Sequence, residues 1–203
     1  MENPEMEEGN EMIKVILIGD VGVGKTNLIN VASGRGFNDN EKSTLSASYL
    51  KKDVTIKGKK YTISLWDTIG QEKLRNLTKL FFKNSKIVIF VYDITNKSSF
   101  TGLALWENDV REMIGDDNII KAIVGNKQDL YLEEAVTESE AMEYADSLNV
   151  KFRITSAKTC PDGFNNFLEE LLIDYLNIRE QSPRTIKLSK TKSSKKNKEN
   201  NCC

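Results

Sequence analysis

Histidine is absent from this chain of 203 residues, which also contains only three cysteines and three prolines. Without histidine, and with Cys160 far from the terminal pair Cys202 and Cys203, an ordinary structural zinc site is excluded. So few cysteines also argue against a disulfide framework. No apolar run approaches the ~18 residues that a membrane-spanning helix needs, and the acidic start lacks the features of a signal peptide. We therefore expect the chain to stay in the cytosol.

Charge is distributed unevenly, although the formal net charge is only −1. Residues 1–11 contain five glutamates and no basic residue, whereas residues 183–203 contain seven Lys or Arg against the single acidic residue Glu199. A chain of 203 residues with 39% apolar composition can bury one sizeable core but is too short for two ordinary domains. We predict one folded domain over 12–180, a disordered acidic extension at 1–11 and a disordered basic tail at 181–203.

Short apolar runs rich in β-branched residues alternate with helical patterns along the chain. Thr137 and Glu140 have the spacing of a capping box, and Gly58 between two of the runs suits a hairpin turn. The order of elements predicts a three-layer α/β fold, with a mostly parallel sheet and one antiparallel edge strand. Ligands of such sheets bind beyond the carboxyl ends of the strands. The predicted strands are 12–18, 54–56, 61–66, 87–92, 119–124 and 151–154.

The stretch GDVGVGKT, at 19–26, follows one predicted strand and precedes a predicted helix. Two glycines followed by Lys25 and Thr26 are the pattern of a phosphate-binding P-loop, in which backbone N–H groups and a lysine face phosphate oxygens. Thr26 would place its hydroxyl on Mg²⁺. A glycine-rich turn that binds no ligand is the alternative, and the flanking strand and helix disfavour it.

Three further segments indicate which nucleotide would bind. In LWDTIGQEK, Asp67 ends a strand, where it could hold Mg²⁺ through water, and the N–H of Gly70 could meet a γ-phosphate. In VGNKQDL, Asp129 could accept both the N1–H and the exocyclic amine of guanine, whereas adenine would leave this carboxylate unpaired. In TSAKT, after the last strand, backbone N–H groups could meet the guanine O6. The sequence therefore favours GTP over ATP.

These four segments, in this order and spacing, resemble the motifs of small GTPases of the Ras superfamily, and specifically of its Rab branch. VYDITNKSSF and the terminal cysteine pair support the Rab branch, and STLSASYL is most similar to its endosomal subgroup. The resemblance implies that Gln71 orients the attacking water beside Lys25 and Gly70, and that Thr44 closes on Mg²⁺ together with Thr26 and Asp67. It implies that GTP contacts Val21, Gly22, Val23, Gly24, Lys25, Thr26, Asn27, Thr44, Gly70, Asn126, Lys127, Asp129, Ser156, Ala157 and Lys158.

The resemblance also implies partners. Tyr49, Trp66 and Phe81 match positions where Rab proteins present three aromatic rings to effectors, although aromatic residues on strands are more often core. Cys202 and Cys203 resemble a double geranylgeranyl acceptor, which the basic tail would assist at an anionic membrane. The expected partners are an exchange factor, a GTPase-activating protein, a prenylation escort, a GDP-dissociation inhibitor and effectors, on the cytoplasmic face of endosomal membranes. The lysine-rich tail has no interleaved aromatic residues, so we expect no nucleic acid.

Two residues depart from the family pattern close to where the γ-phosphate would lie. Val21 stands where Rab proteins usually carry serine, and Ile69 stands where nearly all carry alanine. Because phosphoryl transfer depends on positioning, we hypothesise slow hydrolysis; the alternative is that a shifted backbone absorbs both side chains. A GTP-binding membrane scaffold that does not hydrolyse is an alternative function. A P-loop kinase is a more remote one, because it would not explain NKQD or the terminal cysteines.

Overall fold

A central sheet of six strands forms the framework of the computed structural model, which describes residues 12–41, 44, 48–68, 81–114 and 119–181. The strand order is β2-β3-β1-β4-β5-β6, and only the β2 and β3 pair is antiparallel. The predicted α/β fold with one antiparallel edge strand is therefore confirmed. The strands are β1 (Ile13–Ile18), β2 (Ser48–Ile56), β3 (Lys59–Asp67), β4 (Ile87–Asp93), β5 (Ile120–Asn126) and β6 (Lys151–Ile154).

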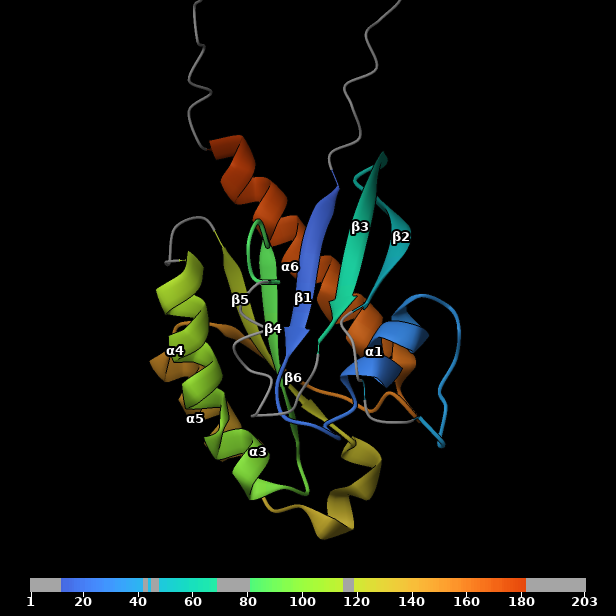
Figure 1. Ribbon diagram of the computed structural model, residues 1–203. Coiled ribbons are helices and arrows are strands. Elements are labelled where there is room, and N and C mark those ends of the chain that lie inside the picture. The colour runs from blue at the N-terminus through green and yellow to red at the C-terminus, as the bar shows by residue number, and fades with distance from the viewer. Residues whose placement is uncertain (1–11, 42–43, 45–47, 69–80, 115–118, 182–203) are drawn as a thin grey trace, which may run out of the picture.

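Helices cover both faces of the sheet (Figure 1). One face carries α1 (Lys25–Ala32) and α6 (Pro161–Gln181), and the other carries α3 (Lys97–Thr101), α4 (Leu103–Ile114) and α5 (Glu138–Ser147). A short 3₁₀ helix, η2 (Gln128–Glu133), follows β5. None of the helices in the described ranges combines the length and hydrophobicity needed to cross a lipid bilayer.

Two apolar cores result, one on each face of the sheet. Strand β1 contributes Val15 and Leu17 to the core under α1 and α6, and Ile16 and Ile18 to the core under α4 and α5. This division follows from the alternation of side chains along a strand, and a central parallel strand must be apolar on both sides. The run IKVILI, apolar except for Lys14, thus favours a place for β1 in the middle of the sheet, and the residues that follow it enter the site at a defined position.

The hairpin between β2 and β3 turns at Lys57 and Gly58, which both have positive φ (50° and 77°). Two positive φ values are the signature of a type I′ turn, which matches the twist of the paired strands. The turn was predicted from Gly58, but β2 starts six residues earlier than the predicted Val54. The charged run Lys51 to Asp53 concealed this part of the strand, because an edge strand exposes one face to water.

Thr137 caps α5 as its spacing predicted, since its side chain accepts a hydrogen bond from the N–H of Glu140 at 3.3 Å. The predicted extensions were 1–11 and 181–203; α6 includes Gln181, and residues 1–11 and 182–203 lie outside the described residues.

Removal of this cap tests the interpretation of the local sequence. We expect Thr137→Ala to lower the free energy of unfolding by about 1 kcal/mol, because one backbone donor of the first turn loses its partner. The thermal midpoint should fall by about 2–4 °C. Ser139→Ala is the matched control. Ser139 lies two residues after Thr137 and is also exposed, so this substitution should leave the midpoint nearly unchanged. Equal effects of the two substitutions would contradict the assignment.

Candidate nucleotide site

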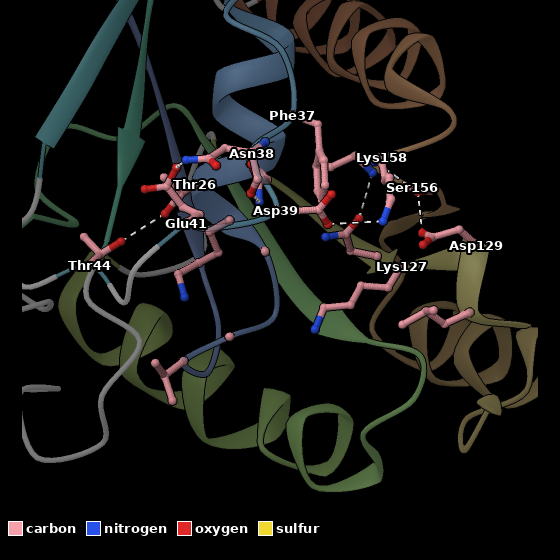
Figure 2. A pocket seen from close by; sticks show the side chains of 18 of the residues that line it. Thr26, Phe37, Asn38, Asp39, Glu41, Thr44, Lys127, Asp129, Ser156 and Lys158 are labelled. Carbon is pink, nitrogen blue, oxygen red and sulfur yellow. Dashed lines mark hydrogen bonds and ion pairs between the residues drawn. The ribbon is translucent and has the colours of Figure 1, made fainter.

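A cavity of about 340 Å³ opens where the loops after β1, β5 and β6 meet, beside the segment that follows α1 (Figure 2). The parallel strands bring their carboxyl ends to this edge, as the fold predicts for a ligand site. Most of the predicted nucleotide-binding residues line the cavity: Val21, Gly22, Gly24, Lys25, Thr26, Asn27, Thr44, Asn126, Lys127, Asp129, Ser156, Ala157 and Lys158.

Two glycines of the P-loop have no possible substitute in this geometry. A Cβ atom on Gly19 would lie 2.1 Å from the carbonyl oxygen of Val91, and one on Gly24 would lie 2.3 Å from the amide nitrogen of Asn126. Both residues also have φ in the left-handed region, at 147° and 94°. Helix α1 begins directly afterwards with no side-chain cap, so its first N–H groups are available to an anion.

Lys25 is almost completely buried, with 5% of its surface exposed. Its ammonium donates hydrogen bonds to the carbonyl oxygens of Gly19 and Asp20, each at 2.8 Å. Burial lowers the pKa of Lys25 to about 8, while the carboxylates of Asp67 and Asp20 oppose that shift. A phosphate oxygen in the cavity would give this desolvated cation an anionic partner.

Three oxygen-bearing side chains converge at one side of the cavity. The hydroxyls of Thr26 and Thr44 donate to the same Asp67 oxygen, Oδ2, at 2.7 and 3.2 Å, and lie 3.0 Å from each other. Asp67 Oδ1 is buried and has no hydrogen-bond partner among the described residues. Burial raises the pKa of Asp67, more than the threonine hydroxyls and Lys25 lower it.

This oxygen cluster fits Mg²⁺, which prefers hard oxygen ligands and retains several waters. The two threonine hydroxyls can turn their lone pairs to the ion, and Asp67 offers an unpartnered oxygen to a metal-bound water. The cluster also joins three segments far apart in sequence: the P-loop, the segment before β2 and the end of β3. The predicted trio of Thr26, Thr44 and Asp67 is therefore brought together.

Asn126 connects two loops instead of pointing freely into the cavity. Its amide nitrogen donates to the carbonyl oxygen of Val23 at 2.9 Å, and its oxygen accepts from the N–H of Ala157 at 3.1 Å. Both of its functional groups are thus used within the protein, and only 2% of Asn126 is exposed. The motif position was predicted from sequence, but this linking role depends on the arrangement of the loops in space.

Ser156 also links two loops, next to Asp129, the predicted acceptor for guanine. Its hydroxyl donates to Asp129 Oδ1 at 2.5 Å and accepts from the N–H groups of Lys158 and Thr159, at 3.1 and 3.0 Å. Asp129 is thereby held in one orientation at the end of the cavity distant from the oxygen cluster (Figure 2). This separation gives the two ends of the site different chemistry, one suited to phosphate and one to a base.

Several lining residues were missed by the sequence analysis. Phe37, Asn38, Asp39, Glu41, Thr68 and Leu130 also line the cavity. Lys158 forms an ion pair with Asp39 at 3.1 Å, and its ammonium lies 5.6 Å from the ring centroid of Phe37. A single aromatic residue within the polar segment GRGFNDN was the only available signal. Outside the cavity, Asp93 pairs with Lys127 at 2.6 Å, and the Trp106 indole donates to Asp20 at 3.0 Å.

The two valines of the P-loop differ in their surroundings. Val21 is 46% exposed and lines the cavity, whereas Val23 is 1% exposed and packs in the core, so only the backbone of Val23 can face a ligand. Ile69, Gly70 and Gln71, on which the predictions about hydrolysis depend, lie outside the described residues.

The three predicted effector-binding aromatic residues are adjacent. Tyr49 stacks on Trp66 with ring centroids 5.0 Å apart, and Trp66 meets Phe81 at 5.8 Å. Tyr49 is 47% exposed, and the other two are partly buried. The Lys14 ammonium lies 4.2 Å from the Trp66 ring centroid and donates to the Phe81 carbonyl oxygen at 2.6 Å, so it contacts two of the three aromatic residues.

Comparison with known proteins gives consistent results. The model of the Ras family matches residues 14–175. The chain is 41% identical over 156 residues to the Ras-related protein Rab-21 of Geodia cydonium, covering 77% of this chain and 68% of that protein. It is 41% identical over 161 residues to Rab-21 of Homo sapiens (79% and 69% covered), and 36% identical over 175 residues to Rab-11C of Dictyostelium discoideum (86% and 77% covered).

The position of Asp67 in the oxygen cluster leads to a prediction. Without bound metal, the raised pKa of Asp67 favours its protonated carboxyl in the folded state. The contribution of Asp67 to stability is therefore largest at acid pH and declines as pH rises through the raised pKa. We expect Asp67→Asn, with GDP and a chelator at neutral pH, to unfold no earlier than the wild type, because a desolvated charge is replaced by a neutral amide.

Addition of Mg²⁺ should separate the two proteins. Saturation at about 100 times Kd stabilises the wild type by about 2.7 kcal/mol, and we expect at least half of this gain to be lost in Asp67→Asn. Thermal unfolding with and without Mg²⁺ measures the gain. Asp53→Asn, at an exposed position of β2, is the control, and an undiminished response to Mg²⁺ in Asp67→Asn would refute the assignment.

Proposed function

The chain belongs to the Ras family, as a GTPase of the Rab type, and on this premise we propose that it is a membrane-anchored GTP/GDP switch that regulates vesicle trafficking. The observation that carries the proposal is the layout of the nucleotide cavity. Lys25 and the uncapped start of α1 stand at one end beside the oxygen cluster, and the oriented carboxylate of Asp129 stands at the other. A guanine nucleotide carries negatively charged phosphates at one end and a base with N–H donors at the other, so its two ends match the two ends of the cavity.

Each predicted site residue would have a definite task in hydrolysis. Lys25 and the N–H groups of the P-loop would bind and orient the phosphates, and Asp129 would select guanine by accepting two hydrogen bonds. Thr26, Thr44 and Asp67 would hold Mg²⁺, which when bound supplies positive charge for the phosphate oxygens. Gln71 would orient the attacking water, and Gly70 would meet the γ-phosphate through its N–H. Positioning and charge stabilisation account for most of the catalysis in such sites.

The switch itself would operate through Thr44. Its hydroxyl touches both Thr26 and Asp67, so the segment before β2 is connected to the metal cluster. The segment with Thr44 leads into β2, where Tyr49 stacks on Trp66. Loss of the γ-phosphate would release Thr44 and the residues near Gly70, and an effector bound to the aromatic surface would sense that release. An exchange factor, a GTPase-activating protein, a prenylation escort and a GDP-dissociation inhibitor would complete the cycle.

Hydrolysis is expected to be slow in this chain. Val21 lines the cavity with 46% of its surface exposed, so its branched side chain occupies space that a serine or glycine would leave open. Ile69, which lies outside the described residues, is bulkier than the alanine usual at its position in the family. A GTP-binding scaffold that does not hydrolyse is the extreme form of this proposal, and a rate measurement separates the two.

We predict that Val21→Ser combined with Ile69→Ala accelerates single-turnover GTP hydrolysis by about 10- to 100-fold, because a displacement of about an ångström can cost that much. Phosphate release from the preloaded protein is the readout, with GTP affinity measured in parallel. Met142→Ala, exposed and distant from the cavity, is the control. If the wild type hydrolyses as fast as the double variant, the proposal of slow hydrolysis fails.

Anchoring to the cytoplasmic face of an endosomal membrane would use the cysteine pair. Two lipid chains, or one with a basic segment, hold a protein stably on a membrane, whereas one chain alone does so marginally. The seven basic residues of 183–203 would each contribute about 1 kcal/mol near an anionic surface.

We therefore expect Cys202→Ser with Cys203→Ser to move the protein from the membrane fraction to the soluble fraction of cell extracts, with nucleotide binding unchanged. Fractionation and imaging of a tagged full chain measure the distribution. Cys160→Ser, at an exposed position near α6, should leave the distribution unaffected. Continued membrane association of the double variant would refute lipid anchoring.

A further inference from the structure

A second cavity, of about 150 Å³, lies between the β2–β3 hairpin and the last turns of α6. Its apolar lining includes Ile56, Tyr61 and Leu176, and its charged lining residues are Lys57, Lys59 and Glu180. We call it the hairpin groove. Strand β3 starts here and ends at the nucleotide site, so the groove lies at the opposite end of the sheet from the nucleotide. Figure 1 shows the start of β3 and the end of α6 at this same end of the molecule.

The groove combines an apolar surface with lysine ammonium groups. Lys57 donates to the Asn177 side chain of α6 at 3.2 Å, which fixes its ammonium at the boundary between hairpin and helix. The Lys59 ammonium lies 5.7 Å from the ring centroid of Tyr61. Strand alternation places Lys60 on the other face, where its register partner Thr55 is exposed. With Lys57 and Lys59 against Glu180, the charged lining is net positive, so a ligand suited to the groove has an apolar group flanked by negative charge.

Residues 1–11 have this composition. They hold five glutamates and no basic residue, and Met6 stands between Glu5 and Glu7. They are also within reach. Strand β1 is parallel to β3 with Ile13 opposite Ile63, so the chain preceding Ile13 leads toward the end of the sheet where β3 begins. Lys59 precedes Ile63 by four residues, about 13 Å along the strand, and 11 extended residues span about 36 Å.

The basic tail is the competing occupant, because α6 ends at Gln181 beside the same groove. Its seven Lys or Arg residues would face Lys57 and Lys59, so like charges oppose its docking. The acidic segment has the opposite sign and brings an apolar side chain, and charge complementarity selects it.

We propose that the acidic segment 1–11 docks in cis in the hairpin groove, with Met6 against the apolar surface and neighbouring glutamates paired with Lys57 and Lys59. The contact neutralises lysines at the end of the molecule where the basic tail begins, and it covers apolar surface that would otherwise face water. It is independent of the nucleotide, because the groove shares no residue with the nucleotide cavity.

Paramagnetic relaxation tests the docking in the full chain. A nitroxide is attached at Asn3→Cys in a protein with Cys160, Cys202 and Cys203 changed to serine and GDP bound. At about 0.05 M salt, we expect methyl signals of Ile56, Ile173 and Leu176 to lose at least about two-fold in intensity relative to the reduced label. Lys57→Glu with Lys59→Glu should restore them, as should Gln at Glu5, Glu7 and Glu8. Lys60→Glu is the matched control and should preserve the broadening.

Three results would overturn the proposal. The first is unbroadened groove methyls in the wild type, and the second is broadening that persists in the variant with Lys57→Glu and Lys59→Glu. The third is broadening of the groove by a nitroxide on the tail, at Cys203 with the other cysteines changed to serine, but not by one at position 3, which would make the tail the occupant. Methyl spectra of each variant report whether it is folded, so loss of structure is recognised separately.

Discussion

Two buried ionisable groups of opposite sign, Lys25 and Asp67, lie at the phosphate end of the nucleotide site, where Lys25 lines the cavity and Asp67 accepts from the lining residues Thr26 and Thr44. Burial shifts the pKa of each group toward its neutral form, while each charge favours ionisation of the other. Burial of these two charged groups does not by itself stabilise the fold, because desolvation of each charge costs several kcal/mol and their mutual attraction offsets that cost only in part. The fold holds both residues in place: the ammonium of Lys25 donates to the carbonyl oxygens of Gly19 and Asp20, and Asp67 ends β3 in register with Leu17 of β1.

In the proposed function, the bound nucleotide and metal would offset the desolvation of both groups. Phosphate oxygens would provide Lys25 with an anion, and Mg²⁺ would give Asp67 a water-mediated partner for the Oδ1 atom that has none among the described residues. Thr44 donates to the same Asp67 oxygen as Thr26, so a change at the oxygen cluster would reach the segment before β2 directly. The proposed switch would thereby couple the contents of the cavity to the segment that leads to the aromatic surface of Tyr49 and Trp66.

The sequence predicted those parts of the structure that local physics determines. The P-loop follows from glycines whose φ values other residues avoid, the I′ turn from Gly58, and the start of α5 from the Thr137 cap. It did not reveal the extent of β2, because a charged edge strand lacks the periodicity of a half-buried one. It also did not reveal the link made by Asn126 between Val23 and Ala157, or the pair of Lys158 and Asp39, since both depend on loops that meet only in the folded chain.

The same distinction underlies our proposal that this chain binds nucleotide as its family does but hydrolyses GTP slowly. The glycines at 19 and 24 cannot change in this geometry, because a Cβ would collide with Val91 or Asn126, so the packing of the fold itself requires the glycines of the phosphate loop. Val21 is 46% exposed, and the packing of the fold places no such demand on it. A branched side chain there is not required by the core, yet it lines the cavity where small displacements would have large kinetic consequences. Hydrolysis rate can therefore diverge at positions that folding and nucleotide binding leave free.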